Sequence, residues 1–204
     1  MNPLEALNIA AFLRINADLQ TPHWILGAAA FVADYLIDLI PLLVIALWCR
    51  GQGLQRNLAV KACLVALVAL GLNQIIIVLW PHPRPFMVRM GHSFMAHAPD
   101  SSFPSDHTTV FAAIGLTLVF HSVRSAIGWS ILALGMLVAW ARIFLGVHFP
   151  SDMVGAVAVV CLGWAAIQLI WGSIGNAVVS QIELIYRLIL ARPISRMDWP
   201  IDGF

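Results

Sequence analysis

Charged residues are scarce in this chain. Aspartate, glutamate, lysine and arginine together make up 10% of its 204 residues, hydrophobic residues make up 61%, and the mean hydropathy is +0.89. Soluble domains use roughly 45–50% apolar residues, so this composition excludes an ordinary soluble domain and predicts an integral membrane protein. The net charge of +1 says little about partners, because the chain has so few charges. For a membrane protein we expect membrane lipids as partners and no nucleic acid.

Cysteine is also rare, and internal repeats and long linkers are missing. The three cysteines, Cys49, Cys63 and Cys161, lie in apolar segments without a CxxC pair, which predicts small buried hydrophobic side chains. The N-terminus lacks the basic start and the small-residue cleavage site of a signal peptide, so we expect it to remain in the mature protein. Residues 1–204 are therefore predicted to form a single domain.

Five hydrophobic segments are long enough to cross a bilayer, which takes about 20 residues per helix. They cover residues 24–49, 58–80, 106–121, 126–146 and 151–173, of which the third is the shortest. The first twenty residues and the segment 176–190 mix apolar and polar residues, as helices that lie on the membrane surface do. The predicted fold is all-α: an integral membrane bundle of about five transmembrane helices with an amphipathic surface helix at each end.

The distribution of basic residues predicts the orientation of this bundle. If the first span runs toward the cytoplasm, seven basic residues fall on one side: Arg50, Arg56, Lys61, Arg124, Arg187, Arg192 and Arg196. Basic residues accumulate on the cytoplasmic side of membrane proteins. The long loop 81–105 and the connection 142–152 then share the opposite, outer face.

The connection ARIFLGVHFPSD contains Arg142, His148 and Asp152 at the ends of two hydrophobic segments. Pro150 suits the first turn of a helix, which places Asp152 about one turn after His148. Asp152 can then accept the Nδ1–H of His148 and leave Nε2 free to attack. Arg142 offers a planar fork for phosphate oxygens. The alternative is an ordinary interfacial arginine and histidine that pair with a carboxylate.

The run PSDHTT at 104–109 has the pattern of a helix start, with Ser105 as the N-cap and Asp106 and His107 in the first turn. Backbone N–H groups at a helix N-terminus bind anions, and His107 can donate a proton to a leaving oxygen. A well-capped helix with an incidental histidine remains the alternative.

A third run, PHPRPF at 81–86, holds Arg84 between two prolines. Proline restricts the residue before it to extended conformations, so Arg84 is expected to be held rigidly at the membrane surface. Charged residues and histidines beside hydrocarbon are costly and usually functional. Brought together, the three runs supply two arginines, two histidines, a serine and a carboxylate, which favours a membrane-embedded phosphatase.

The three runs, in this order, resemble the type 2 phosphatidic acid phosphatase (PAP2) superfamily over about residues 77–173. The matching residues are Arg84-Pro85, Pro104-Ser105, His107, Arg142, His148 and Asp152. The resemblance implies His148 as a nucleophile that forms a phosphohistidine, Asp152 as its partner and His107 as general acid. It further implies that Arg84, Ser105 and Arg142 hold the phosphate, without a metal or another cofactor.

Two positions depart from the superfamily pattern. Ile77 stands where a lysine is usual, and Asp106 replaces a glycine. Both departures resemble the branch that contains the bacitracin-resistance undecaprenyl-diphosphate phosphatases. That branch removes the terminal phosphate of a C55 lipid diphosphate on the outer face of the bacterial inner membrane, for carrier recycling in peptidoglycan synthesis. A diphosphate needs additional cationic contacts, and the loop 86–97 offers three candidates: Arg89, His92 and His97.

Several alternatives stay open at this point. The enzyme could be a broader lipid phosphatase for phosphatidic acid or phosphatidylglycerol phosphate, or a phosphotransferase to lipid A. A transporter or sensor of lipid phosphates is the non-enzyme alternative. Five histidines on the outer side could form a zinc site, although their spacing does not match HExxH. Asp34 and Asp38, and likewise Asn73 and Gln74, could form interhelical hydrogen bonds or line a proton path or a lipid slot.

Overall fold

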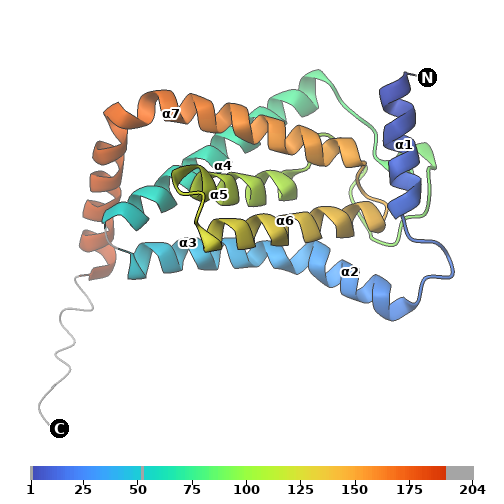
Figure 1. The fold of residues 1–204 in the computed structure, drawn as a ribbon, viewed down its shortest axis with the longest axis horizontal. Coiled ribbons are helices and arrows are strands. Elements are labelled where there is room, and N and C mark those ends of the chain that lie inside the picture. Colours follow the sequence, from blue (N-terminus) through green and yellow to red (C-terminus); the bar gives the residue numbers. More distant parts are fainter. Residues whose placement is uncertain (1, 52, 192–204) are drawn as a thin grey trace, which may run out of the picture.

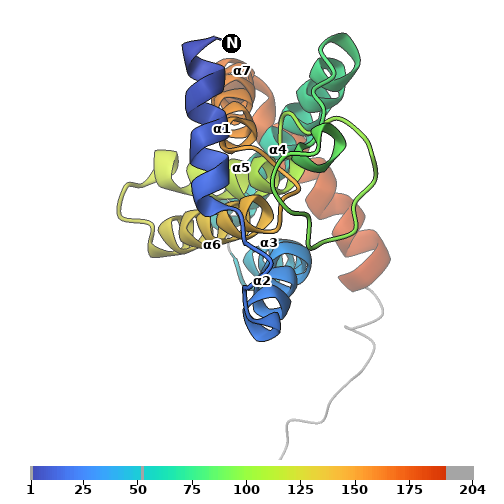
Figure 2. The same ribbon diagram turned by 90° about the vertical axis from the view of Figure 1, so that its right-hand side faces the viewer.

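The computed structural model describes residues 2–51 and 53–191, and all regular secondary structure in this part is helical, without a strand (Figure 1). Helices α2 (His23–Tyr35), α3 (Leu39–Arg50), α4 (Gly53–Leu79), α6 (Ala126–Phe144) and α7 (Pro150–Tyr186) run along the bundle. Helix α1 (Pro3–Ile15) lies across one end (Figure 2). The prediction of an all-α membrane bundle with a surface helix at the N-terminus is confirmed. Arg192 and Arg196, which support the predicted orientation, lie outside the described residues.

Four helical segments are long and apolar enough to cross a membrane: His23–Arg50, Gly53–Leu79, Ala126–Phe144 and Pro150–Ile189. Helix α5 (Asp106–His121), the predicted third span, has only 16 residues. At 1.5 Å per residue it is roughly 24 Å long, less than the roughly 30 Å of a hydrocarbon core. It packs against α4, α6 and α7 instead, so it is the inner helix of the bundle.

The first predicted span is interrupted. A 3₁₀ turn, η1 (Leu36–Asp38), separates α2 from α3. Pro41 lies in the first turn of α3, has no N–H to donate, and its ring clashes with a carbonyl four residues earlier in a regular α-helix. The helical hydrogen bonding is therefore broken just before this proline.

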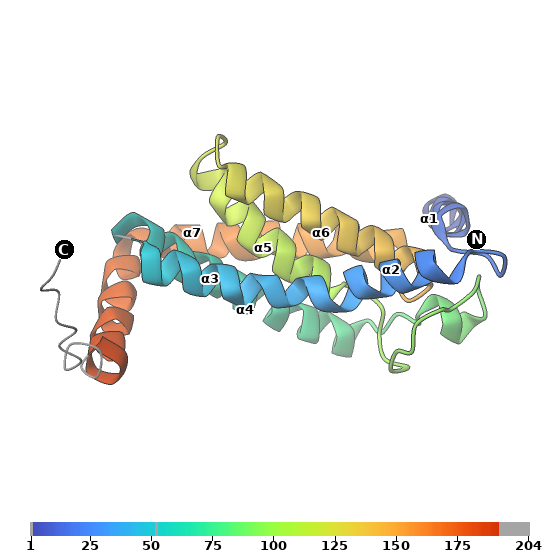
Figure 3. The same ribbon diagram turned by 90° about the horizontal axis from the view of Figure 1, so that it is seen from below.

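The last predicted span and the predicted surface segment 176–190 are one continuous helix. Helix α7 has 37 residues and continues into a π-helical turn, η3 (Arg187–Ala191). Its last part turns away from the bundle axis, as the red end of the ribbon shows (Figures 1 and 3). The polar residues in this segment thus mark a change of direction and not a break in the helix.

The cysteines are less buried than predicted. Cys49 and Cys161 are exposed and Cys63 is partly buried. In a membrane bundle an apolar side chain can face lipid instead of the core, so apolar surroundings in sequence do not determine burial.

Small residues bring α5 and α6 into close contact. A Cβ added at Gly128 would lie 3.1 Å from the carbonyl oxygen of Gly115, and one at Gly135 would lie 2.6 Å from the Cβ of Phe111. Such close approach is typical of helix contacts in membranes. It aligns the N-terminus of α5 with the C-terminus of α6 at the end of the bundle that α1 covers.

Candidate active site

The three sequence motifs meet at this end of the bundle, around a cavity of about 410 Å³. Its walls come from α4, the loop 80–105 with its short 3₁₀ helix η2 (Pro85–Val88), the start of α5, the end of α6 and the α6–α7 connection. Six of the ten predicted site residues line it: Arg84, His97, Asp106, His107, Arg142 and His148. Ser105 and Asp152 are fully buried behind them. Arg89 and His92 are exposed and do not line the cavity.

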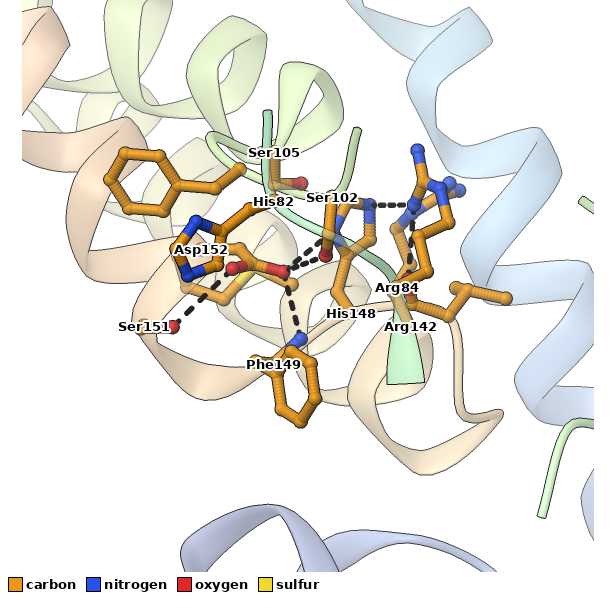
Figure 4. Close-up of polar contacts among 12 residues, drawn as sticks. His82, Arg84, Ser102, Ser105, Arg142, His148, Phe149, Ser151 and Asp152 are labelled. Carbon is orange, nitrogen blue, oxygen red and sulfur yellow. Dashed lines mark hydrogen bonds and ion pairs between the residues drawn. The ribbon is translucent and has the colours of Figure 1, made fainter. Parts of the chain in front are cut away.

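His148 is held by Asp152 (Figure 4). Nδ1 of His148 lies 3.1 Å from Oδ2 of Asp152, which also accepts the backbone N–H of Phe149 at 2.8 Å and the hydroxyl of Ser102. An ionised carboxylate only accepts hydrogen bonds, so Nδ1 carries the proton and Nε2 keeps its lone pair. Asp152 occupies the first turn of α7 after Pro150, and this helix start fixes its carboxylate beside the histidine.

Arg84 lies on the other side of the His148 ring (Figure 4). Its Nη1 is 3.2 Å from Nε2 of His148 and donates to the carbonyl of Val147 at 3.0 Å. Its Nη2 donates to the carbonyl of Ser101 at 3.2 Å, and its Nε donates to Oδ1 of Asp100 at 2.8 Å. The guanidinium is thereby held in a single place, directly against the nitrogen that would attack.

Arg142 is the second buried arginine of the cavity, at 2% exposure. Its Nη1 donates to the carbonyl of Ala33 at 3.3 Å and its Nη2 to Nε2 of His97 at 3.0 Å. Its Nε has no partner, and within the described part of the chain no carboxylate lies within ion-pair distance of it. A buried cation without a counter-ion is costly, so this side chain is well placed to bind an anion.

The start of α5 forms the remaining wall. Ser105 is the N-cap, and its Oγ accepts the N–H of Thr108 at 3.5 Å. Oδ1 of Asp106 accepts from Nδ2 of Asn73 on α4 at 2.7 Å, and the same amide donates to Oγ1 of Thr109 at 2.9 Å. Asn73 therefore forms the interhelical contact predicted as one of its two roles, whereas its neighbour Gln74 lines the cavity. Asp34 and Asp38 are exposed.

The surroundings shift the pKa values of the groups in the connecting segments. Burial, assisted by Arg142 and Arg84, lowers the pKa of His148 to about 4 against the opposing hydrogen bond and charge of Asp152. Burial and the charge of Arg84 lower the pKa of His97. Partial burial alone would raise the pKa of Asp100, but the hydrogen bond and charge of Arg84 bring it below its usual value. Both histidines are accordingly neutral at pH 7.

Sequence reasoning missed three of the polar residues at this site. Ser102 is fully buried and donates to Asp152. Asp100 pairs with Arg84, and Asn8 contacts the start of α7. The five histidines considered as a zinc site do not form a cluster: across residues 2–51 and 53–191, no three His, Cys, Asp or Glu side chains converge as metal ligands.

These features define a helical membrane protein in which a histidine–carboxylate pair faces two buried arginines. The family model of the PAP2 superfamily matches residues 58–178, and the chain belongs to this superfamily. YbjG of Escherichia coli strain K12, provisionally named an undecaprenyl-diphosphatase, is 38% identical over 200 residues, covering 98% of this chain and 100% of that protein. The undecaprenyl-diphosphatase BcrC of Bacillus subtilis strain 168 is 34% identical over 129 residues, covering 63% and 66% of the two chains.

The fold is also similar to that of a solved structure. The crystal structure of LpxE from Aquifex aeolicus superimposes with a TM-score of 0.62 at 22% identity. The match covers 78% of this chain and 93% of that one. At this identity the likeness shows a shared fold, in agreement with the family assignment.

Proposed function

We propose that this protein is a membrane phosphatase that hydrolyses undecaprenyl diphosphate, a C55 lipid diphosphate, to the monophosphate and inorganic phosphate. The observation that carries the proposal is the setting of His148, which lines the cavity and is held by Asp152 at 3.1 Å through Nδ1. The names of the relatives at 34% and 38% identity support the choice of substrate.

In the proposed reaction the terminal phosphate binds between Arg84 and Arg142, which neutralise its charge. The phosphate takes over the Nη1 donor of Arg84, which contacts Nε2 of His148 at 3.2 Å in the free protein. Nε2 then attacks the terminal phosphorus in line, so an N–P bond forms while the bond from phosphorus to the bridging oxygen breaks. The electron pair of that bond stays on the lipid monophosphate. Burial and the charge of Arg142 lower the pKa of His107 to about 3 in the free protein, and the negative charge of the bound diphosphate raises it again, so that His107 takes up a proton on binding. His107 then donates this proton to the oxygen of the lipid monophosphate.

Water completes the cycle. His107 accepts a proton from a water molecule, whose oxygen attacks the phosphorus of the phosphohistidine. The N–P bond breaks, phosphate leaves and His148 is restored with its lone pair on Nε2. Positioning and charge neutralisation account for most of the catalysis in phosphoryl transfer, which suits a site built around two guanidinium groups.

We further propose that the site faces the outer side of the bacterial cytoplasmic membrane. The opposite end of the bundle from the site carries Arg50 at the end of α3, Arg56 near the start of α4 and Arg124 between α5 and α6 (Figure 1). An excess of basic residues favours the cytoplasmic side for that end. A lipid diphosphate in the outer leaflet could then reach the cavity with its tail in the bilayer.

Phosphate release from the purified protein in detergent tests the proposed function. The assay compares a C55 diphosphate, a C15 diphosphate and phosphatidic acid in the presence of EDTA, because the proposed phosphate contacts require no metal. We expect both diphosphates to be hydrolysed faster than phosphatidic acid. Faster hydrolysis of phosphatidic acid would indicate a broader lipid phosphatase, and no release from any lipid would favour a transporter or sensor. Loss of activity in EDTA that one divalent ion restores would contradict the metal-free mechanism.

A further inference from the structure

Helix α1 lies outside the segment that the family model matches, yet it contacts the candidate active site. The match covers residues 58–178, whereas α1 precedes it by more than forty residues and lies across the site end of the bundle (Figure 2). Phe12 of α1 is fully buried, and its ring packs edge-on against that of Phe149 with the centroids 5.2 Å apart. The N-terminal helix is thus docked onto the connection that carries His148.

A chain of hydrogen bonds runs from Asn8 of α1 toward the His148 ring. Nδ2 of Asn8 donates to Oγ of Ser151 at 2.9 Å. Oγ of Ser151 donates to Oδ1 of Asp152 at 3.3 Å (Figure 4), and Oδ2 of Asp152 accepts from Nδ1 of His148 at 3.1 Å. Because Asn8 occupies a lone pair of the Ser151 hydroxyl, the hydroxyl proton is directed toward the carboxylate.

Asn8 also completes the start of α7. The first N–H groups of a helix have no partner within the helix, and Phe149 at the N-cap position has no side-chain oxygen to accept them. The N–H of Ser151 donates to Oδ1 of Asn8 at 2.9 Å, so the amide of Asn8 contacts Ser151 through both of its polar atoms. This two-point contact fixes the residue that immediately precedes Asp152.

We infer that Asn8 is a positioning residue for the proposed nucleophile. It orients the Ser151 hydroxyl, Ser151 helps to fix the carboxylate of Asp152, and Asp152 holds the ring of His148 in its attacking orientation. The inference rests on the proposed phosphatase function. Neither Asn8 nor Ser151 lines the cavity, so loss of this chain should slow the attack and leave substrate binding intact.

Kinetics of single and double variants of the full chain test this role on a C55 diphosphate. We expect Asn8→Ala and Ser151→Ala each to lower kcat roughly 3- to 10-fold, because one hydrogen bond to the carboxylate or to its support is lost. KM should stay within about twofold of the wild-type value. Ser151→Thr keeps the hydroxyl and should retain most of the activity. The double variant should lose no more kcat than the more impaired single variant, because both substitutions break the same chain of hydrogen bonds.

Asn16→Ala is the matched control. Asn16 also ties α1 to the bundle, through Nδ2 bonds to the carbonyls of His92 and Phe144 at 2.9 and 3.0 Å, but it has no bond to Ser151 or Asp152. It should lower thermal stability and leave kcat near the wild-type value. Wild-type kcat in both Asn8→Ala and Ser151→Ala, or an equal drop in Asn16→Ala, would overturn the inference. A wild-type protein that releases no phosphate would instead overturn the proposed function.

Discussion

His148 meets a carboxylate through one ring nitrogen and a guanidinium through the other. If it is the nucleophile, His148→Ala should abolish turnover while the protein still folds and binds substrate. Phosphate release and substrate binding, measured on the same purified variant, check this. Acid-labile phosphate trapped on a residue other than His148 would contradict the assignment.

Asp152→Asn should cause a severe loss of turnover, but a less complete loss than His148→Ala causes. The substitution keeps the size of the side chain but replaces an acceptor-only carboxylate by an amide, which can stabilise the wrong histidine tautomer. Loss of the orienting carboxylate costs about 10⁴-fold in kcat in the serine protease triad, and we expect an effect of up to this order here. The measurement is kcat of the two variants. A higher residual kcat in Asp152→Asn than in His148→Ala fits this expectation, and a lower one contradicts it.

The lowered pKa of His148 predicts an unusual pH profile. Only neutral His148 can attack, and because its pKa is lowered to about 4, the neutral form predominates down to about one unit above that value. An unperturbed histidine would instead lose activity below about pH 6.5. We therefore expect the contribution of His148 to kcat/KM to stay constant from about pH 8 to about pH 5 and to fall at lower pH.

The pH profile of Asp152→Asn tests whether His148 causes the fall in kcat/KM at low pH. Asp152 raises the pKa of His148, so its removal should move the limb to still lower pH. A wild-type limb near pH 6.5 that stays in place in the variant would show that another group titrates there.

The main site residues could be predicted from sequence because short motifs carry them. Arg142, His148 and Asp152 lie within eleven residues of each other, and the start of α7 at Pro150 brings the last two together. Ser102 and Asn8 could not be predicted in this way, since their partners lie 50 and 143 positions away in sequence. Their roles depend on how the long loop and α1 fold back onto the start of α7.

Among the elements, the long loop 80–105 carries the three residues that the sequence offered for additional contacts to a diphosphate but could not rank. His97 lines the cavity with its Nε2 3.0 Å from Nη2 of Arg142, whereas Arg89 is exposed at the end of η2 in a left-handed conformation with φ 54°. Neutral His97 supplies no charge but holds the guanidinium of Arg142 through this contact. We therefore expect His97→Ala to lower kcat/KM on a lipid diphosphate by roughly tenfold and to affect it more than Arg89→Ala does. His92→Ala is the control from the same loop. A larger loss in Arg89→Ala would return the role to the only permanent charge of segment 86–97.

The contact between α5 and α6 predicts a stability effect at Gly135. A Cβ at this position would lie 2.6 Å from the Cβ of Phe111, so Gly135→Ala should push the two helices apart. Overpacking of this kind costs about 1–3 kcal/mol, and turnover should fall as well, because α5 carries His107 and α6 carries Arg142. Thermal unfolding in detergent and phosphate release measure the two effects.

Gly27→Ala and Gly71→Ala are matched controls for this substitution. Both glycines lie in helices and an added Cβ would meet nothing within 4 Å. Their variants should unfold near the wild-type temperature. Equal destabilisation by all three substitutions would indicate a general effect of β-carbons in these helices and not the α5–α6 contact.

The sequence predicted where helices lie better than how they end. Hydrophobic length located every long helix, because about 20 apolar residues suffice to identify a span. It did not distinguish the inner helix α5 from a full span, nor did it reveal that α7 continues through its polar segment. Both properties depend on neighbouring helices, which hydropathy does not describe. The break before Pro41 was visible in the sequence as a proline inside an apolar run, but its effect appears only in the backbone.

For the whole molecule, the orientation can be tested with cysteine labelling. In a variant without Cys49, Cys63 and Cys161, we expect Ser93→Cys to react with a membrane-impermeant maleimide added to intact cells. Arg124→Cys, at the opposite end of the bundle, should react only after the membrane is opened. The reverse pattern would place the candidate active site on the cytoplasmic side.

The carbonyl of Ala33 binds Arg142 and the ring of Phe12 packs on Phe149, and both come from segments that precede residue 58. The three motifs of the candidate active site therefore depend on N-terminal segments outside the residues that the family model matches. A chimera that joins residues 58–178 of this chain to the N-terminal helices of another superfamily member must also recreate these two contacts. Exchange of the N-terminal segment between relatives would consequently change the candidate active site without altering a single motif residue.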